Sequence, residues 1–282
     1  MMGDIFGIDV SSYQGTINWK KVKQTDVKFA ILKVIRKDLN PDKQFENNWR
    51  GCTDNGIEIQ GVYNYSYATS VTKAVSDANK VLKILNGRQT MVWLDVEDNC
   101  QKGLKKRLID IIMAYGDVIT KAGLKFGVYT GASFYNTYIK PYATLPYALW
   151  IASYGTNNGK AQENKRPRIA TCIGWQYSSR GRVDGVAGNV DVNVFFGCAE
   201  PKKTVYAALP TIKSGSNGTQ ALILQQDLNH FGYRGENGKP LTLDGKFGKN
   251  SVYSLKNWQK ANKLTADGIY GSKSYTKMKS ML

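Results

Sequence analysis

Eight short apolar segments in the first 200 residues constrain the fold of this chain more than any other feature. They lie at 4–10, 27–35, 57–67, 91–97, 124–130, 147–153, 170–178 and 189–196. Helical patterns at 18–24, 43–55, 70–86 and 104–122 separate the first five, and little helix separates the last three. This alternation favours a parallel α/β sheet, and eight strands in about 200 residues predict an irregular (β/α)8 TIM-like barrel.

A doubly wound open sheet is the alternative to the barrel. Such a sheet normally carries a glycine-rich phosphate-binding loop after its first strand. The segment "DVSSYQG" at 9–15 has no such glycine pattern. The sequence therefore favours the barrel.

The composition of the chain changes after residue 200, where prolines and small residues occur without a helical or strand periodicity. We predict a catalytic barrel over 1–200, a linker over 201–213 and a small three-helix domain over 214–282. Helical patterns occur near 218–231, 249–263 and 271–282. Two similar turns, "DGKFGKNS" at 244–251 and "DGIYGSKS" at 267–274, mark an internal repeat in this small domain.

The scarcity of histidine excludes several kinds of chemistry. The only histidine is His230, so residues 1–200 cannot form a Ser-His-Asp site or an ordinary zinc site. We expect no metal and no cofactor. The four cysteines at 52, 100, 172 and 198 form no C-x-x-C pair, and we expect free thiols. Carboxylates, tyrosines and lysines remain for catalysis.

Charge and hydropathy narrow the possible partners. The net charge is +17, of which residues 201–282 contribute +9, and such a field favours polyanionic partners or simply aids solubility. A nucleic acid is permitted by charge, but the chain has no recognised nucleic-acid-binding motif. No run of 18 apolar residues exists, so we expect no membrane span. The first residues do not read as a signal peptide.

Four carboxylates fall near the strand ends where barrel enzymes place their chemistry. Asp9 ends the first strand, Asp95 and Glu97 end the fourth with two-residue spacing, and Asp191 lies in the eighth. Strands one and eight of a closed barrel are neighbours, so the four acids are expected to surround one pocket. Crowded carboxylates raise one another's pKa, which suits a general acid in glycoside hydrolysis.

Aromatic residues near the strand ends support a sugar site. Amphipathic rings offer a sugar both a flat apolar face and hydrogen-bonding groups, although plain core packing is the alternative explanation. The candidate substrate-binding residues are Tyr63, Tyr65, Tyr129, Trp150, Trp175 and Tyr177.

Several motifs resemble the family-25 glycoside hydrolases. They are "GIDVSSYQGTINW" (7–19), "VWLDVE" (92–97), "LWIASYG" (149–155) and "GWQYSSRGRVDGVAGNVDVNVF" (174–195). These phage and bacterial lysozymes cleave the β-1,4 bond between N-acetylmuramic acid and N-acetylglucosamine of peptidoglycan. The resemblance covers nearly all of residues 4–196 and implies an irregular barrel and muramidase activity.

The resemblance also implies roles for the acids. Glu97 matches the general acid that later acts as base. Asp95 matches the neighbour that either holds the substrate's 2-acetamido group for attack or acts as the nucleophile. Asp9 and Asp191 match the outer acids of the site. The chain departs from the family at Arg36, where an acid is usual, and at "YNY" (63–65), where Tyr-His-Phe is common.

Residues 214–282 resemble the three-helix peptidoglycan-binding domain of wall hydrolases, through the two D-G-x-aromatic-G turns and the "LQQDLN" and "NWQKANKL" segments. A muramidase with this tail and no signal peptide resembles a phage endolysin, which resides in the host cytoplasm until a pore releases it to the cell wall. Bacterial cell-wall peptidoglycan is therefore the expected partner.

Two other functions are compatible with parts of the sequence, namely a chitinase and a wall-binding protein with an inactive barrel. A chitinase uses a longer D-x-x-D-x-D-x-E strand, of which "MVWLDVE" supplies only the last D-x-E. A wall-binding module on an inactive barrel would lack the acids, yet all four are present.

Overall fold

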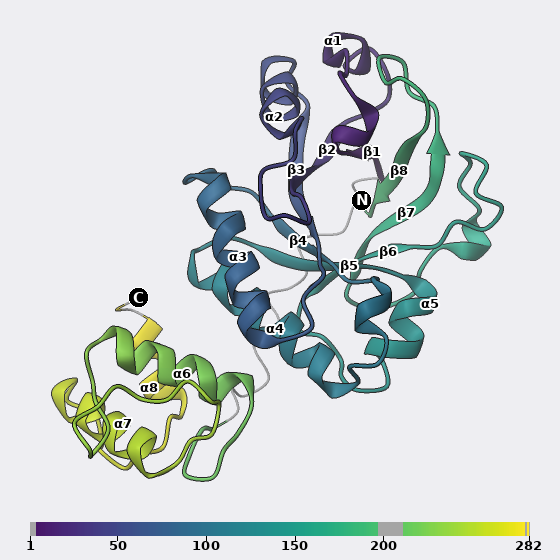
Figure 1. Cartoon of the computed structure of the whole chain (residues 1–282). Coiled ribbons are helices and arrows are strands. Elements are labelled where there is room, and N and C mark those ends of the chain that lie inside the picture. Colours follow the sequence, from purple (N-terminus) through teal and green to yellow (C-terminus); the bar gives the residue numbers. More distant parts are fainter. Residues whose placement is uncertain (1–3, 197–210, 280, 282) are drawn as a thin grey trace. The chain divides into compact units, whose positions relative to one another are not determined.

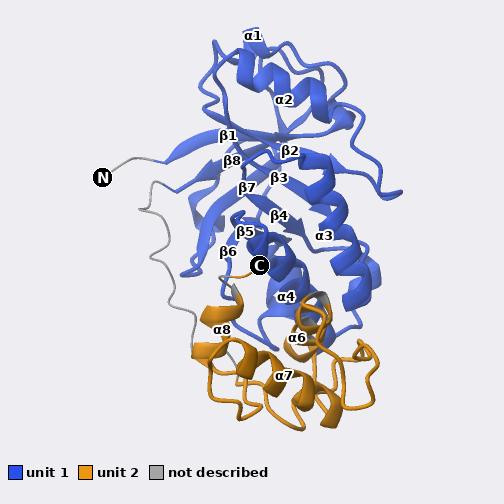
Figure 2. Cartoon of the chain, turned by 90° about the vertical axis from the view of Figure 1, so that its left-hand side faces the viewer, with its two compact units in different colours: residues 1–203 blue, residues 204–282 orange. Residues whose placement is uncertain are grey.

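The computed structural model describes residues 4–196, 211–279 and 281. The chain divides into two compact units, Met1–Lys203 and Thr204–Leu282, coloured separately in Figure 2. Most of the linker predicted at 201–213, namely residues 201–210, lies outside the described residues. Each unit has its own buried apolar cluster, and each is described by itself.

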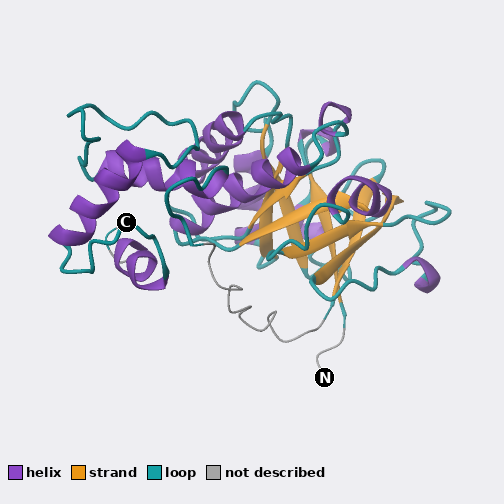
Figure 3. Cartoon of the chain, turned by 90° about the horizontal axis from the view of Figure 1, so that it is seen from below, coloured by secondary structure: helices purple, strands orange, loops and turns teal. Residues whose placement is uncertain are grey.

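Eight strands of the first unit form a closed barrel in sequence order (Figures 1 and 3). Each strand lies within a few residues of a predicted segment. The strands are β1 Ile5–Val10, β2 Phe29–Ile35, β3 Glu58–Tyr65, β4 Val92–Asp95, β5 Phe126–Gly131, β6 Ala148–Ala152, β7 Cys172–Gly181 and β8 Val190–Phe195.

The helices of this unit follow the early strands and become sparse later. They are α1 Trp19–Val22, α2 Phe45–Asp54, α3 Val71–Leu85, α4 Lys106–Lys121 and the short α5 Ala132–Phe134. Short 3-10 turns occur at Ser12–Gln14, Asn99–Gln101 and Glu163–Lys165, and a π turn at Tyr135–Ile139. Among the described residues, no helix is both long and apolar enough to cross a bilayer.

The direction of the eighth strand departs from a (β/α)8 barrel. Strands β1 to β7 are parallel to their neighbours, but β8 is antiparallel to both β7 and β1. An antiparallel pair needs only a hairpin connection, whereas a parallel pair needs a long crossover. This explains why no helix lies between β7 and β8. The fold is a mixed α/β barrel with one reversed strand.

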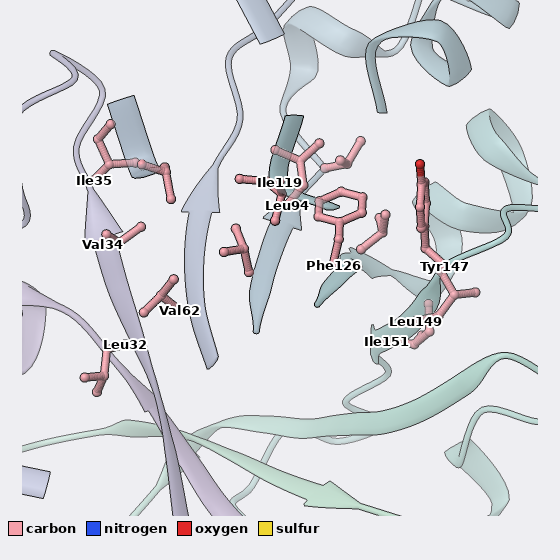
Figure 4. Packing of buried hydrophobic residues seen from close by; sticks show 14 of the residues in the cluster. Leu32, Val34, Ile35, Val62, Leu94, Ile119, Phe126, Tyr147, Leu149 and Ile151 are labelled. Atoms are coloured by element: carbon pink, nitrogen blue, oxygen red, sulfur yellow. The ribbon is translucent and has the colours of Figure 1, made fainter. Parts of the chain in front are cut away.

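The outer faces of the strands pack against the helices in the larger apolar cluster. Figure 4 shows Val62, Leu94 and Leu149 of the strands in one layer with Ile119 of α4. All four side chains are buried almost completely. Burial of such side chains contributes about 1.5–3 kcal/mol each and holds the helices on the barrel.

Aromatic rings fill the interior of the barrel. A second cluster of the first unit consists only of strand residues: Phe29, Ile31, Trp93, Tyr129, Trp150 and Phe195. Trp93 lies 5.7 Å from Trp150 and 5.8 Å from Phe195 between ring centroids, with edge-to-face geometry. Such rings in contact stabilise one another beyond their burial. The interior is therefore a packed plug beneath the strand ends.

Glycines on the neighbouring strands make room for these rings. A Cβ at Gly127 would lie 2.4 Å from Trp93, and one at Gly61 would lie 2.6 Å from the same side chain. Gly7 and Gly174 face Phe29 and Phe195 in the same way, at 2.4 and 2.5 Å. Large rings and absent side chains thus alternate around the barrel, which lets the plug reach a close-packed density.

The second unit contains α6 Thr219–His230, α7 Lys249–Ala261 and α8 Ser272–Lys279. Leu224, Leu228, Leu255 and Trp258 of these helices lie in one buried apolar cluster. Among the described cysteines, Cys52, Cys100 and Cys172 are free thiols, and Cys198 lies outside the described residues.

A duplicated hydrogen-bond network explains the sequence repeat in this unit. The amide nitrogen of Gln225 lies 3.0–3.1 Å from three acceptors, which are Asp244 Oδ1, the Lys246 carbonyl and Ser251 Oγ. The oxygen of Gln225 accepts from the backbone of Gly245 at 2.9 Å. One buried glutamine on α6 therefore organises the whole first turn.

Gln259 repeats this arrangement at the second turn. Its nitrogen lies 3.0–3.1 Å from Asp267 Oδ1, the Ile269 carbonyl and Ser274 Oγ. Its oxygen accepts from the backbone of Gly268 at 2.9 Å. Gly245 and Gly268 have φ values of 68° and 74°, which glycine adopts without strain. The repeated "DG" turns are thus two copies of one structural device.

The plug yields a first prediction. Gly127→Ala should lower the free energy of unfolding by about 1–3 kcal/mol, because its new methyl group overlaps Trp93 in a full interior. Gly103→Ala is the matched control, since a Cβ there meets nothing within 4 Å, and its effect should stay within about 0.5 kcal/mol. Denaturant unfolding followed by tryptophan fluorescence measures both. Equal effects of the two changes would contradict the packed plug.

Candidate active site

The barrel brings the four predicted acids together. Asp9 on β1 pairs directly with Asp191 on β8. Asp95 is the last residue of β4, and Glu97 follows two residues later. Burial raises the pKa of Asp95, and the charges of Glu97, Asp9 and Asp191 raise it further. Asp9 and Asp95 are each only 5% exposed, so this is a largely desolvated acidic cluster.

The reversed strand changes how Asp191 reaches this cluster. We expected Asp191 in the eighth strand, and it is the second residue of β8. Because β8 runs antiparallel, its amino end lies at the same mouth as the carboxyl ends of the other strands. The expected neighbourhood of Asp191 thus arises from a strand direction that the sequence analysis did not predict.

Burial and like charges set the proton affinities of the cluster. Burial raises the pKa of Asp9 to about 6, although hydrogen bonds from Asn193 and Gln176 oppose this shift. Burial, with the charge of Asp9, raises the pKa of Asp191 to about 8. The pKa of Glu97 is raised by burial and then by the charges of Asp9 and Asp98. The cluster therefore holds protons at a pH where isolated carboxyls have lost them.

Asp95 has an unused hydrogen-bonding position. Its Oδ1 atom is buried and has no hydrogen-bond partner in the described structure. Lys33 lowers the pKa of Asp95 but does not outweigh burial and the neighbouring acids, so the net shift is upward. A buried polar atom without a partner is costly, and a catalytic role is one explanation for it. Asp95 Oδ1 is therefore an acceptor that the described protein residues leave unused.

Two of the predicted sugar-binding tyrosines line the same mouth. Tyr63 and Tyr65 are partly exposed, and the Lys33 ammonium lies 5.8 and 5.9 Å from their ring centroids. The Tyr65 hydroxyl donates to Asp98 Oδ2 at 3.2 Å. Their position beside the acids keeps both as candidates for sugar binding.

The other four predicted aromatics are buried, which does not suit a stacking platform. Trp150 and Trp175 are 1% and 0% exposed, and Tyr129 and Tyr177 are 6% and 8% exposed. Trp175 and Tyr177 belong to the outer cluster, while Trp150 and Tyr129 belong to the plug. Proximity to a strand end did not distinguish an exposed ring from a packed one. Direct sugar contact by these four residues stays a prediction, which their burial does not favour.

Three polar residues that the sequence analysis did not select surround Asp9. Gln176 and Asn193 each donate to Asp9 Oδ2 at 2.8 Å. The oxygen of Gln176 also accepts from the hydroxyl of Tyr154. Gln176 and Asn193 lie in the quoted 174–195 motif, and Asn193 shares the parity of Asp191, which was the available signal.

Other potential sites in the chain are distinct from this cluster. In residues 4–196 and 211–279 no group of three or more His, Cys, Asp or Glu side chains is arranged to hold a metal ion. A surface cavity of about 520 Å³ lies between the 16–19 segment and α2. None of the four acids lines it, so it is separate from the acidic cluster.

Comparison with known proteins agrees with this geometry. The family model "Glycosyl hydrolases family 25" matches residues 8–186, and "Putative peptidoglycan binding domain" matches residues 217–278. The first match covers more than half of the chain. The chain therefore belongs to family 25 of the glycosyl hydrolases and is a glycoside hydrolase with a peptidoglycan-binding domain.

Relatives of known type support the same conclusion. The chain is 28% identical to an autolytic lysozyme of Clostridium acetobutylicum over 274 residues, covering 94% of this chain and 76% of that protein. It is 29% identical to lysozyme M1 of Streptomyces globisporus over 211 residues, covering 68% of each. The catalytic domain of endolysin ply40 from Listeria monocytogenes bacteriophage P40 is 26% identical, with a TM-score of 0.58, covering 70% of this chain and 94% of that domain.

The acidic cluster predicts an unusual pH dependence of stability. The raised pKa of Asp191 means that the folded state binds more protons than the unfolded state between about pH 4 and pH 8, so stability falls as pH rises. Asp191→Asn removes the cost of ionising this buried carboxyl group and should stabilise the protein more at pH 8 than at pH 5. Each unit of raised pKa is worth about 1.4 kcal/mol.

Denaturant unfolding at pH 5 and pH 8 measures this difference. Asp184→Asn is the control, because Asp184 is an exposed acid on the connection between β7 and β8. Its effect should be small and similar at both pH values. A stabilisation by Asp191→Asn that does not grow with pH would contradict the desolvated cluster.

Proposed function

We propose that the protein is an N-acetylmuramidase that hydrolyses the β-1,4 bond between N-acetylmuramic acid and N-acetylglucosamine in bacterial peptidoglycan. The observation that carries the proposal is the pair Asp95 and Glu97 at the barrel mouth, with a raised pKa on Glu97 and an unpartnered Asp95 Oδ1. This pair supplies a proton donor and an acceptor on neighbouring positions. The family membership and the lysozyme relatives point to the same reaction.

Glu97 acts as the general acid in this proposal. It donates its proton to the glycosidic oxygen as the bond to the anomeric carbon breaks, and positive charge develops on the sugar. The remaining negative charges of the cluster stabilise that oxocarbenium-like centre. Glu97, now a carboxylate, then removes a proton from the water that attacks the anomeric carbon.

Asp95 acts on the other side of the reaction. Its free Oδ1 either accepts the N–H of the 2-acetamido group, whose carbonyl oxygen then attacks the anomeric carbon, or itself forms the bond to that carbon. Both roles need a carboxylate oxygen that the protein leaves without a partner, as Asp95 does. Tyr63 and Tyr65 form the adjoining sugar-binding wall.

The second unit serves as the wall-binding module in this proposal. It is strongly basic, since residues 204–282 hold 11 basic and 4 acidic side chains for a net charge of +7, and it contains the matched peptidoglycan-binding segment at 217–278. Long-range attraction to an anionic wall raises the rate of encounter. We also propose a phage endolysin role, in which the enzyme stays in the host cytoplasm until it is released to the wall. The similarity to the phage endolysin ply40 supports that role.

Glu97→Gln should abolish turnover and leave wall binding intact. Glutamine keeps the size of the side chain but cannot donate a proton in the same way, and general acid catalysis is worth about 10²–10⁴ in rate. Turbidity of a wall suspension measures turnover, and sedimentation with walls measures binding. A variant that keeps more than about a tenth of the wild-type rate would remove Glu97 from the acid role.

Mass spectrometry of the reducing ends identifies the bond that the wild-type enzyme cuts in purified peptidoglycan. New muramic acid ends are expected. Glucosamine ends would indicate a glucosaminidase, and free peptides would overturn the glycosidase assignment. Activity on chitin without activity on peptidoglycan would favour the chitinase alternative.

The fragment 204–282, expressed alone, should fold and bind cell walls. It has its own apolar cluster and both glutamine-centred turns, although a core of this size gives only modest stability. Circular dichroism reports folding, and cosedimentation with purified walls reports binding. A folded fragment that stays in the supernatant would contradict the module's role.

A further inference from the structure

The direction of one hydrogen-bond chain in the barrel is unambiguous. The indole nitrogen of Trp150 carries a hydrogen and can only donate, and it lies 2.9 Å from Asn193 Oδ1. The oxygen of Asn193 therefore faces Trp150, and its amide nitrogen faces Asp9 Oδ2 at 2.8 Å. The plug thus fixes the orientation of the amide, and Asn193 presents an N–H to Asp9.

Gln176 presents a second N–H to the same atom. Its nitrogen lies 2.8 Å from Asp9 Oδ2. Its oxygen accepts from the hydroxyls of Tyr129, at 2.7 Å, and Tyr154, so the amide is held in this orientation. A hydrogen bond from an amide N–H is stronger to a carboxylate oxygen than to the oxygen of a neutral carboxyl group. These two donors therefore favour the charged form of Asp9.

Titratable groups approach Asp9 from every side of the mouth. They are Asp191 on β8, Asp95 and Glu97 at the end of β4, Lys33 on β2, Tyr63 on β3, Tyr129 on β5 and Tyr154 after β6. Three of these groups are acids, and the negative charge of each opposes the ionisation of Asp9. The pair of amide donors distinguishes Asp9, because Asp95 Oδ1 has no donor at all.

We propose that Asn193 and Gln176, oriented by Trp150 and Tyr129, are positioning residues that hold Asp9 as a carboxylate, and that this fixed charge keeps the proton on Glu97. The proposal rests on the proposed role of Glu97 as general acid. It gives Trp150 a function in the reaction without contact with the sugar. It also explains why a buried acid stands beside the catalytic pair.

The alkaline limb of the pH profile of kcat/KM tests the proposal. In Asn193→Leu, Asp9 loses a donor and gains a proton more readily, so the negative charge beside Glu97 is lost. Glu97 then releases its proton at lower pH, and the alkaline limb should move down by about one pH unit, as expected for one charge at close range. Trp150→Phe places a smaller aromatic ring in the plug and removes the indole donor, and should shift the limb in the same direction by less.

A double mutant separates this mechanism from general damage. Asp9→Asn alone should move the limb down, and adding Asn193→Leu should give no further shift, because the charge is already gone. Asn64→Leu is the matched control. Asn64 is also buried, at 3% exposure, but donates to Tyr115 at 3.2 Å, away from Asp9. That change should lower the melting temperature and leave the limb in place.

Two results would overturn the proposal. One is a limb that stays at the wild-type position in Asn193→Leu and in Trp150→Phe, with circular dichroism showing both folded. The other is an additive shift in the double mutant. If Asn193→Leu does not fold, Trp150→Phe alone decides. Failure of the proposed function can be distinguished from failure of this proposal. The first would appear as an active Glu97→Gln variant, and the second as an alkaline limb that does not move.

Discussion

Four carboxyl groups crowded in one poorly hydrated mouth are the constraint on which the rest of the barrel depends. Neighbouring negative charges and burial both work against ionisation, so the cluster holds protons and costs folding free energy. The fold distributes hydrogen-bond donors unequally among the acids. It gives two amide donors to Asp9 and leaves Asp95 Oδ1 with none. That asymmetry converts four similar side chains into groups with different proton affinities and different chemistry.

The aromatic plug connects stability with the chemistry above it. Trp93, Trp150 and Phe195 fill the interior beside glycines that leave space for their rings. A close-packed interior has low compressibility, so the plug supplies a rigid floor for the acids. Trp150 belongs to both levels, since its ring packs in the plug and its N–H orients Asn193. Packing in the interior of the barrel is thereby coupled to the position of Asp9.

The sequence predicted much of this architecture, and its failures have physical causes. Apolar segments located all eight strands, but periodicity carries no direction, so the reversal of β8 was missed. Burial was the second gap. Trp175 lies near a strand end and yet points to the outer layer, because alternation along β7 places Gln176 inward instead. Amides such as Gln176 and Asn193 carry no charge, and only their contacts with Asp9 distinguish them from ordinary core polar residues. The repeated "DG" turns could be recognised in the sequence, whereas the role of Gln225 and Gln259 in joining these turns to the helices could not.

In the free enzyme, Asp9 is expected to lose its proton at lower pH than Glu97, whose pKa is raised by burial and by the charge of Asp9. Carboxyl ¹³C chemical shifts report the ionisation of individual acids, and the Asp9→Asn and Glu97→Gln spectra assign the two signals. The account predicts that the Asp9 signal titrates at lower pH than the Glu97 signal. A Glu97 signal that titrates first, while Asp9 still holds a proton, would contradict it.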